Sequence, residues 1–191
     1  LLNRILGGAL SSRLFRRLRE DMGIAYQVTS EYQAFRDGGM LLVEGSTSPG
    51  NRMAALDAIV EELNALVTGL RPVDEEELWL AKTQLRSTHL LGSQDAYTVM
   101  SRLGTQRLYF GRALEPDQIL AEIDRVSVEE MNQLVMEGLR PWLPDLAVAW
   151  VCPKPPEQKS QQLEQKLHQD GGKHPEHSVE ASHAPEPARM A

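Results

Sequence analysis

The sequence predicts an α+β fold in which helices pack on one face of an antiparallel sheet. Several segments carry apolar residues at helical spacing, whereas residues 25–35 and 39–47 alternate as strands do. The run Arg36-Asp37-Gly38-Gly39 between them is typical of a hairpin turn. A third strand is expected at 145–151. Three strands are too few to cover so many helices, so further strands are expected upstream.

The opening residues, LLNRILGG, already follow a helical period, which suggests a chain that begins within a helix. A second helix is expected after Ser11 or Ser12, either of which can cap it, and Gly23 is expected to end it. Its apolar stripe consists of Leu14, Phe15, Leu18 and Met22. The residues expected to face solvent are Arg13, Arg16, Arg17 and Glu20.

Arg19 and Tyr26 are the candidate functional residues. Arg19 lies about 40° beyond Phe15 on the helix, at the rim of the apolar stripe, where its guanidinium can lie over a cleft. Tyr26 is expected to share the more apolar strand face with Val28, its ring half-buried and its hydroxyl available to a ligand. From the residues alone, the simpler interpretation is favoured, in which Arg19 is a solvated helix-end cation and Tyr26 a half-buried sheet aromatic.

The later helices are expected at about 50–68, from Asp74, at 94–110, at 116–124 and from Ser127. Asp74 with Glu77 and Ser127 with Glu130 have the spacing of capping boxes. Each box is flanked by an apolar pair that can form a hydrophobic staple, Val73 with Leu78 and Val126 with Met131. Pro141 and Pro144 are expected to end the last helix.

The composition argues against several classes of protein. A net charge of −7 is unlike the basic field of a nucleic-acid binder, and no apolar run approaches the ~20 residues of a membrane span. The single cysteine, Cys152, excludes an internal disulfide and is expected to be a buried small side chain. Residues 154–191 are expected to be a disordered polar tail after a domain at 1–153. The tail holds the pair His174 and His177.

Three segments resemble the pitrilysin/insulinase family of zinc metallopeptidases, the inverted zincins. They are LGGALSSRLFRRLREDMGIAY, VDEEELWLAKTQL and VSVEEMNQL, and in order and spacing they span Leu1 to about Pro153. The resemblance is to the non-zinc, C-terminal half of a clamshell in which an α+β unit is duplicated within each half. It implies that Tyr26 hydrogen bonds to the scissile-bond oxyanion and that Arg19 holds the substrate backbone on its carboxyl side.

The family's zinc motif, H-x-x-E-H, does not occur in the sequence, and His89 is the only histidine outside the tail. The resemblance therefore implies that zinc is held by a missing half or a partner subunit, and that this chain alone is inactive. The expected partners are a peptide substrate and a zinc-bearing half, in cis or in trans. The strand edge at 38–43 is a second candidate substrate contact.

A non-catalytic structural or partner subunit of the same fold is the alternative. A structural subunit would have no requirement for Arg19 and Tyr26 together, and both are present. A cytoplasmic location is expected, with a periplasmic one left open.

Overall fold

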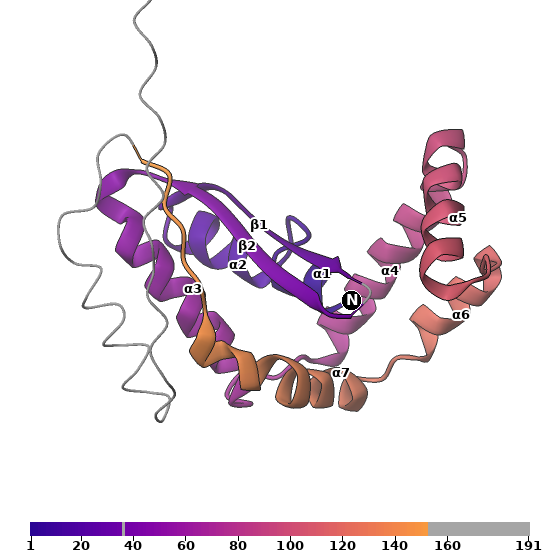
Figure 1. Cartoon of the computed structure of the whole chain (residues 1–191). Helices are drawn as coiled ribbons and strands as arrows, with labels where there is room; N and C mark the ends of the chain where they lie inside the picture. The colour runs from indigo at the N-terminus through magenta and orange to yellow at the C-terminus, as the bar shows by residue number, and fades with distance from the viewer. Residues whose placement is uncertain (36, 153–191) are drawn as a thin grey trace, which may run out of the picture. The chain divides into compact units, whose positions relative to one another are not determined.

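A computed structural model describes residues 1–35 and 37–152 of the chain (Figure 1). Residues up to Ala147 form one compact unit, and Val148 begins a second, of which 148–152 are described. The predicted tail, with His174 and His177, lies outside the described residues. The elements are α1 (Leu2–Leu6), α2 (Arg13–Phe15), η1 (Arg16–Asp21), β1 (Ala25–Ala34), β2 (Gly39–Thr47), η2 (Pro49–Asn51), α3 (Arg52–Val67), α4 (Glu75–Gly92), α5 (Ala96–Phe110), α6 (Pro116–Arg125), α7 (Val128–Leu134), η3 (Val135–Leu139) and η4 (Arg140–Asp145).

Strands β1 and β2 form the predicted antiparallel hairpin. At the turn, the backbone N–H of Phe35 donates to the carbonyl of Gly38 at 2.8 Å. Val28 and Ser30 are buried on the face of β1 that contacts α1, α2 and η1. Helices therefore pack on one face of an antiparallel pair, which confirms the predicted α+β class. The expectation of additional strands upstream stays a prediction.

The core consists of two apolar clusters, and α1 contributes to both. Ile5 packs with side chains of α3, α4, α7 and η3, whereas the next residue, Leu6, packs with α2, η1, the sheet and α3. The largest fully buried apolar side chains are Leu6, Leu14, Leu18, Leu66, Val73 and Val135. Because Leu14 and Leu18 anchor the helix of Arg19 to β1 through the second cluster, this cluster positions the candidate site.

A close contact joins the end of α1 to the middle of β1. A Cβ on Gly7 would lie 2.7 Å from the backbone nitrogen of Ser30, so only glycine fits without a shift of the backbone. The N–H of Ser30 donates to the carbonyl of Gly7 at 3.1 Å, and the Ser30 hydroxyl donates to Oδ1 of Asn3 at 2.6 Å. These bonds satisfy the buried Ser30 and hold α1 against the sheet.

Both predicted capping boxes are confirmed. The carboxylate of Asp74 accepts from the N–H of Glu77 at 2.9 Å, and the hydroxyl of Ser127 accepts from the N–H of Glu130 at 3.1 Å. The predicted serine cap of α2 is wrong. Ser12 occupies the N-cap position, but its buried hydroxyl makes no hydrogen bond within the described residues.

The predicted strand at 145–151 is also wrong. Residues 140–145 form the short 3-10 helix η4, and the residues after it have no regular secondary structure as far as 152, the last described. A strand needs a neighbour for its ladder, and in the described part of the chain β1 and β2 pair with each other only. The predicted burial of Cys152 depended on that strand, and Cys152 is exposed. Among the described helices, none combines the length and apolarity needed to cross a bilayer.

Candidate functional site

Arg19 is presented by a helix that widens before it ends. After α2 the chain continues into the π-helical turn η1, in which the N–H of Met22 donates to the carbonyl of Arg17 at 3.1 Å. Leu18 faces the core and the neighbouring Arg19 is exposed. Gly23 then adopts a φ of +62°, the left-handed conformation predicted for a glycine at this helix end. The chain reverses there, and β1 starts beside η1.

Tyr26 lies at a β-bulge, which corrects the predicted burial of its ring. Ala25 pairs with Thr47 and Gln27 pairs with Ser46, so Tyr26 is an extra residue on β1. One extra residue shifts the alternation of faces by one position. Ala25 is therefore buried, with 8% exposed, whereas Tyr26 is 79% exposed instead of lying on the face of Val28.

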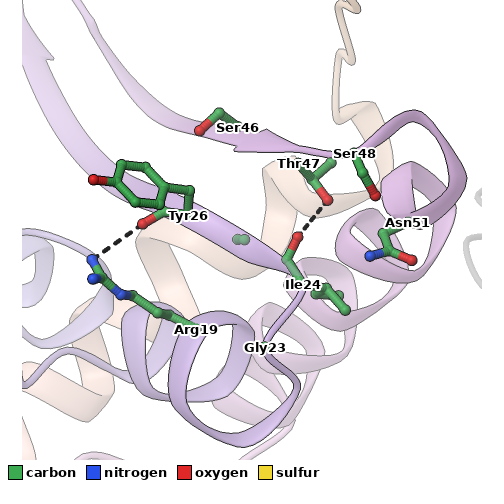
Figure 2. A pocket seen from close by; sticks show the side chains of 9 residues that line it. Arg19, Gly23, Ile24, Tyr26, Ser46, Thr47, Ser48 and Asn51 are labelled. Carbon is green, nitrogen blue, oxygen red and sulfur yellow. Dashed lines mark hydrogen bonds between the residues drawn. The ribbon is translucent and has the colours of Figure 1, made fainter.

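The structure brings Arg19 and Tyr26 together (Figure 2). Nη1 of Arg19 donates to the backbone carbonyl of Tyr26 at 3.1 Å, and Cζ of Arg19 lies 5.4 Å from the centre of the Tyr26 ring. Arg19 also lies 5.1 Å from the ring centre of Phe15, at the rim of the apolar stripe as predicted. Within the described residues the Tyr26 hydroxyl makes no hydrogen bond, so it is available as a donor.

An open depression of about 580 Å³ adjoins this pair. Arg19 and Tyr26 line one side, and Ser48 and Asn51 line the other, where the chain passes from β2 into α3 (Figure 2). The hydroxyl of Thr47 donates to the carbonyl of Ile24 at 2.5 Å and ties the end of β2 to the start of β1. The depression therefore has a guanidinium and a phenol on one side and polar side chains on the other.

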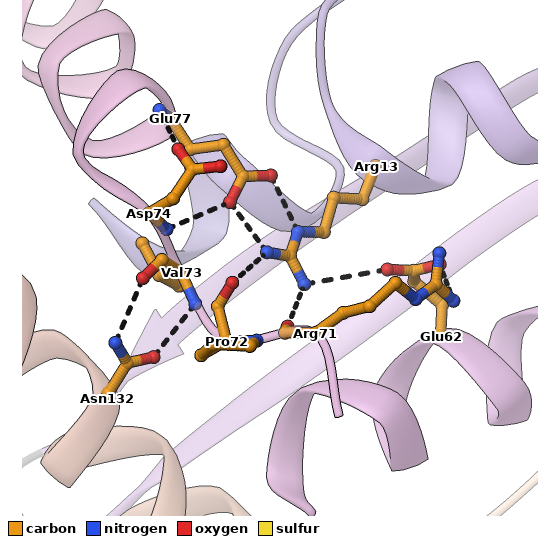
Figure 3. A network of polar contacts seen from close by, with 8 residues as sticks. All are labelled: Arg13, Glu62, Arg71, Pro72, Val73, Asp74, Glu77 and Asn132. Carbon is orange, nitrogen blue, oxygen red and sulfur yellow. Dashed lines mark hydrogen bonds and ion pairs between the residues drawn. The ribbon is translucent and has the colours of Figure 1, made fainter. Parts of the chain in front are cut away.

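Arg13 is a largely buried residue next to the candidate site whose contacts sequence reasoning missed (Figure 3). It was predicted to face solvent, yet only 12% of its side chain is exposed. Its guanidinium makes a bidentate pair with Glu77 of α4, at 2.7 and 2.6 Å, and donates to the backbone carbonyls of Arg71 and Pro72. Burial, the largest single effect, lowers the pKa of Arg13, but hydrogen bonding to Glu77 and the nearby carboxylates raise it above its ordinary value.

Glu62 of α3 completes this network from inside the protein (Figure 3). Its side chain is 3% exposed and accepts ion pairs from Arg71 at 2.8 Å and from Arg13 at 3.6 Å. A carboxylate among the apolar positions of a helix requires a buried cation, because an unpaired charge there is costly. The position of Glu62 among the apolar residues Ala58, Leu63 and Leu66 was the sequence signal from which a buried cation, here Arg13, could have been predicted.

The described residues hold no group of three or more His, Cys, Asp or Glu side chains that could bind a metal ion. His89 of α4 lies beside Arg102 of α5, with ring nitrogens 3.3 Å from Nη1. Burial, and then the charge of Arg102, lower the pKa of His89 below its usual value. A zinc ion therefore does not fit the described part of this chain.

Residues 1–85 match the family described as the Peptidase M16 inactive domain. An uncharacterized zinc protease of Mycobacterium leprae is 40% identical over 139 residues, which are 73% of this chain and 31% of that protein. Residues 1–85 therefore match a peptidase M16 domain, and the chain is similar to part of this zinc protease. An uncharacterized zinc protease of Bacillus subtilis is 34% identical over 154 residues, 80% of this chain and 36% of the relative.

Solved structures share the fold of this chain. A peptidase M16 inactive domain from Pseudomonas fluorescens superposes with a TM-score of 0.62 at 20% identity, covering 71% of this chain and 32% of that one. A conserved protein from Enterococcus faecalis V583 superposes with a TM-score of 0.60 at 26% identity. The match covers 70% of this chain and 30% of that one. The predicted resemblance to pitrilysin/insulinase-type peptidases, in their inactive domain, is confirmed. The chain spans about a third of the length of the curated relatives it matches.

Proposed function

We propose that this chain is the non-zinc half of an M16 metallopeptidase, which completes the active site and binds the backbone of the substrate peptide. It acts with a zinc-bearing half, in cis or in trans. The observation that carries the proposal is the juxtaposition of Arg19 and the exposed Tyr26 at one open depression. A structural subunit would have no requirement for this pair.

Tyr26 donates its hydroxyl to the carbonyl oxygen of the scissile peptide bond as that oxygen gains negative charge. The bulge supports this role because it turns the phenol out of the core and leaves its hydroxyl without an internal partner in the described residues. A donor that is already in place needs little reorganisation when negative charge develops on the carbonyl oxygen. Such a donor contributes roughly 10²–10³ in rate.

Arg19 holds the substrate backbone next to the bond that is cleaved. A guanidinium has five N–H groups, and one of them is occupied by the carbonyl of Tyr26. That bond, with the rings of Phe15 and Tyr26, orders the long side chain before substrate arrives. The remaining N–H groups donate to backbone carbonyls of the peptide, and a pre-ordered side chain loses less entropy on binding.

Zinc belongs to the other half in this proposal. The curated relatives are named zinc proteases, and the described residues of this chain offer no cluster of ligands. When bound there, zinc supplies Lewis-acid chemistry and an activated water. This chain's own residues bind and orient the peptide and stabilise charge.

The test replaces Tyr26 by Phe in the chain combined with its zinc-bearing half. We expect kcat for peptide hydrolysis to fall about 100-fold because one donor to the oxyanion is lost. Zinc content and melting temperature should not change, since the hydroxyl has no internal partner in the described residues. A kcat within about twofold of wild type would reject the role of Tyr26 and favour a structural subunit.

A further inference from the structure

The wall of the depression opposite Arg19 and Tyr26 is polar and has unused hydrogen-bonding groups. It is formed by Ser46, Ser48 and Asn51, where β2 ends and α3 begins (Figure 2). Neither serine hydroxyl nor the Asn51 amide makes a side-chain hydrogen bond within the described residues. By contrast, the hydroxyl of Thr47 between them is taken by the carbonyl of Ile24. The other three groups are therefore available to a ligand.

The charge of the depression restricts what that ligand can be. Of the described residues that line it, Arg19 is the one that carries a charge, and no carboxylate joins it. Hydroxyls and a primary amide can all donate hydrogen bonds, and the guanidinium can only donate. The hydroxyls and the amide can also accept, so discrimination against an ammonium comes from the positive charge of Arg19. The wall together with Arg19 therefore suits a group with acceptor oxygens better than an ammonium, and its polar groups gain no partner from a large apolar side chain.

We propose that Ser48 and Asn51 form a specificity subsite for a substrate side chain that ends in a carbonyl or carboxylate oxygen, such as Gln or Glu. This inference rests on the proposed function, because Arg19 and Tyr26 must hold the peptide backbone on the near side of the depression. A side chain projecting from that backbone crosses the depression and accepts hydrogen bonds from the Asn51 amide and the Ser48 hydroxyl. Glu gains further from the field of Arg19.

Asn51 can be replaced without damage to the helix that follows it. It occupies the N-cap position of α3, but its side chain makes no capping hydrogen bond. The change Asn51→Leu keeps the size of the side chain and removes the amide. Ser48→Ala removes one hydroxyl, and Ser87→Ala removes an exposed hydroxyl on α4, outside the depression, as a matched control.

The experiment titrates the full chain with acetyl-Ala-X-Ala-amide peptides, where X is Glu, Gln, Met or Lys, and follows the protein by NMR. Met matches Glu and Gln in length without an acceptor oxygen. We expect the Glu and Gln peptides to shift the Asn51 side-chain resonances and to bind about fivefold more tightly than Met, the gain from one net hydrogen bond. Lys should bind no better than Met. Asn51→Leu should abolish the difference and Ser48→Ala should reduce it, whereas Ser87→Ala should leave it unchanged.

The outcomes separate this subsite from the proposed function. If all four peptides shift Arg19 and Tyr26 with equal affinity, backbone binding stands and the subsite is rejected. If the preference for Glu and Gln survives in Asn51→Leu, the subsite is likewise rejected. If no peptide shifts Arg19, Tyr26 or Asn51, both the subsite and the backbone-binding role fail.

Discussion

At the scale of single residues, one inserted position decides what Tyr26 can do. In a regular β1, Tyr26 would share the buried face of Val28, and its hydroxyl would lie against the helices. The bulge moves Ala25 into that place and turns Tyr26 outward, beside the guanidinium of Arg19. Bulges commonly re-aim a side chain near a functional site. The geometry therefore places a donor and a cation on one accessible surface.

Arg16 and Arg19 provide a matched comparison, since both are exposed arginines on η1. Only Arg19 contacts Tyr26 and lines the depression. In the chain combined with its zinc-bearing half, Arg19→Ala should lower kcat/KM by about 10-fold or more, because a charge-assisted hydrogen bond to the substrate is lost. Arg16→Ala should leave kcat/KM nearly unchanged. Steady-state kinetics that give equal losses for the two variants would contradict the assigned geometry.

At the scale of elements, the Arg13 network holds the helix of Arg19 in place. Arg13 lies at the start of α2, and its partners belong to α3, α4 and the segment between them (Figure 3). A bidentate guanidinium–carboxylate pair has a defined geometry, which lysine cannot reproduce. The network thus fixes where α2 and η1 begin, and with them the direction from which Arg19 approaches β1.

Arg13→Ala should lower the free energy of unfolding by about 2–4 kcal/mol, because it removes the bidentate pair with Glu77 and leaves the buried Glu62 with Arg71 alone. Arg17 forms an exposed ion pair with Glu61 at 3.5 Å. Arg17→Ala should therefore change the free energy of unfolding by less than about 1 kcal/mol. Urea denaturation of the full chain measures both. Similar small losses for the two variants would show that the buried network does not stabilise the fold.

Local signals predicted the elements well. The capping boxes at Asp74 and Ser127, the hairpin turn before Gly38 and the left-handed Gly23 each depend on a few neighbouring residues, and all occur as expected. Features set by tertiary contacts were missed. The bulge at Tyr26 depends on how β1 pairs with β2, which no short segment encodes.

The remaining errors have the same cause. The hydrogen-bond partners of Arg13 lie 58–64 positions away, so the helical pattern alone placed Arg13 in solvent. The apolar run at 145–151 resembles a strand, but a strand requires a neighbour, and the described residues provide none for it. Arg19 and Tyr26 were predicted as site residues from the resemblance to a family. Their contact with each other could be seen only in the folded structure.

For the whole protein, the proposed function divides one active site between two halves. The chain spans about a third of its curated relatives, and its described residues offer no metal cluster. The full chain with His174→Ala and His177→Ala, which removes the histidine pair of the tail, should retain far less than one zinc per chain after dialysis. Elemental analysis that finds about one tightly held zinc ion per chain would contradict this division.

Reconstitution of peptidase activity from two separately purified halves tests whether the halves share one active site. The zinc-bearing half alone should contain zinc but hydrolyse a peptide slowly. Adding this chain should raise kcat by about 100-fold or more, because it supplies the donors of Tyr26 and Arg19. The double variant Tyr26→Phe, Arg19→Ala should bind the other half equally well and give no such increase. Full activity of the zinc-bearing half by itself, or equal stimulation by the double variant, would show that the two halves do not share one active site.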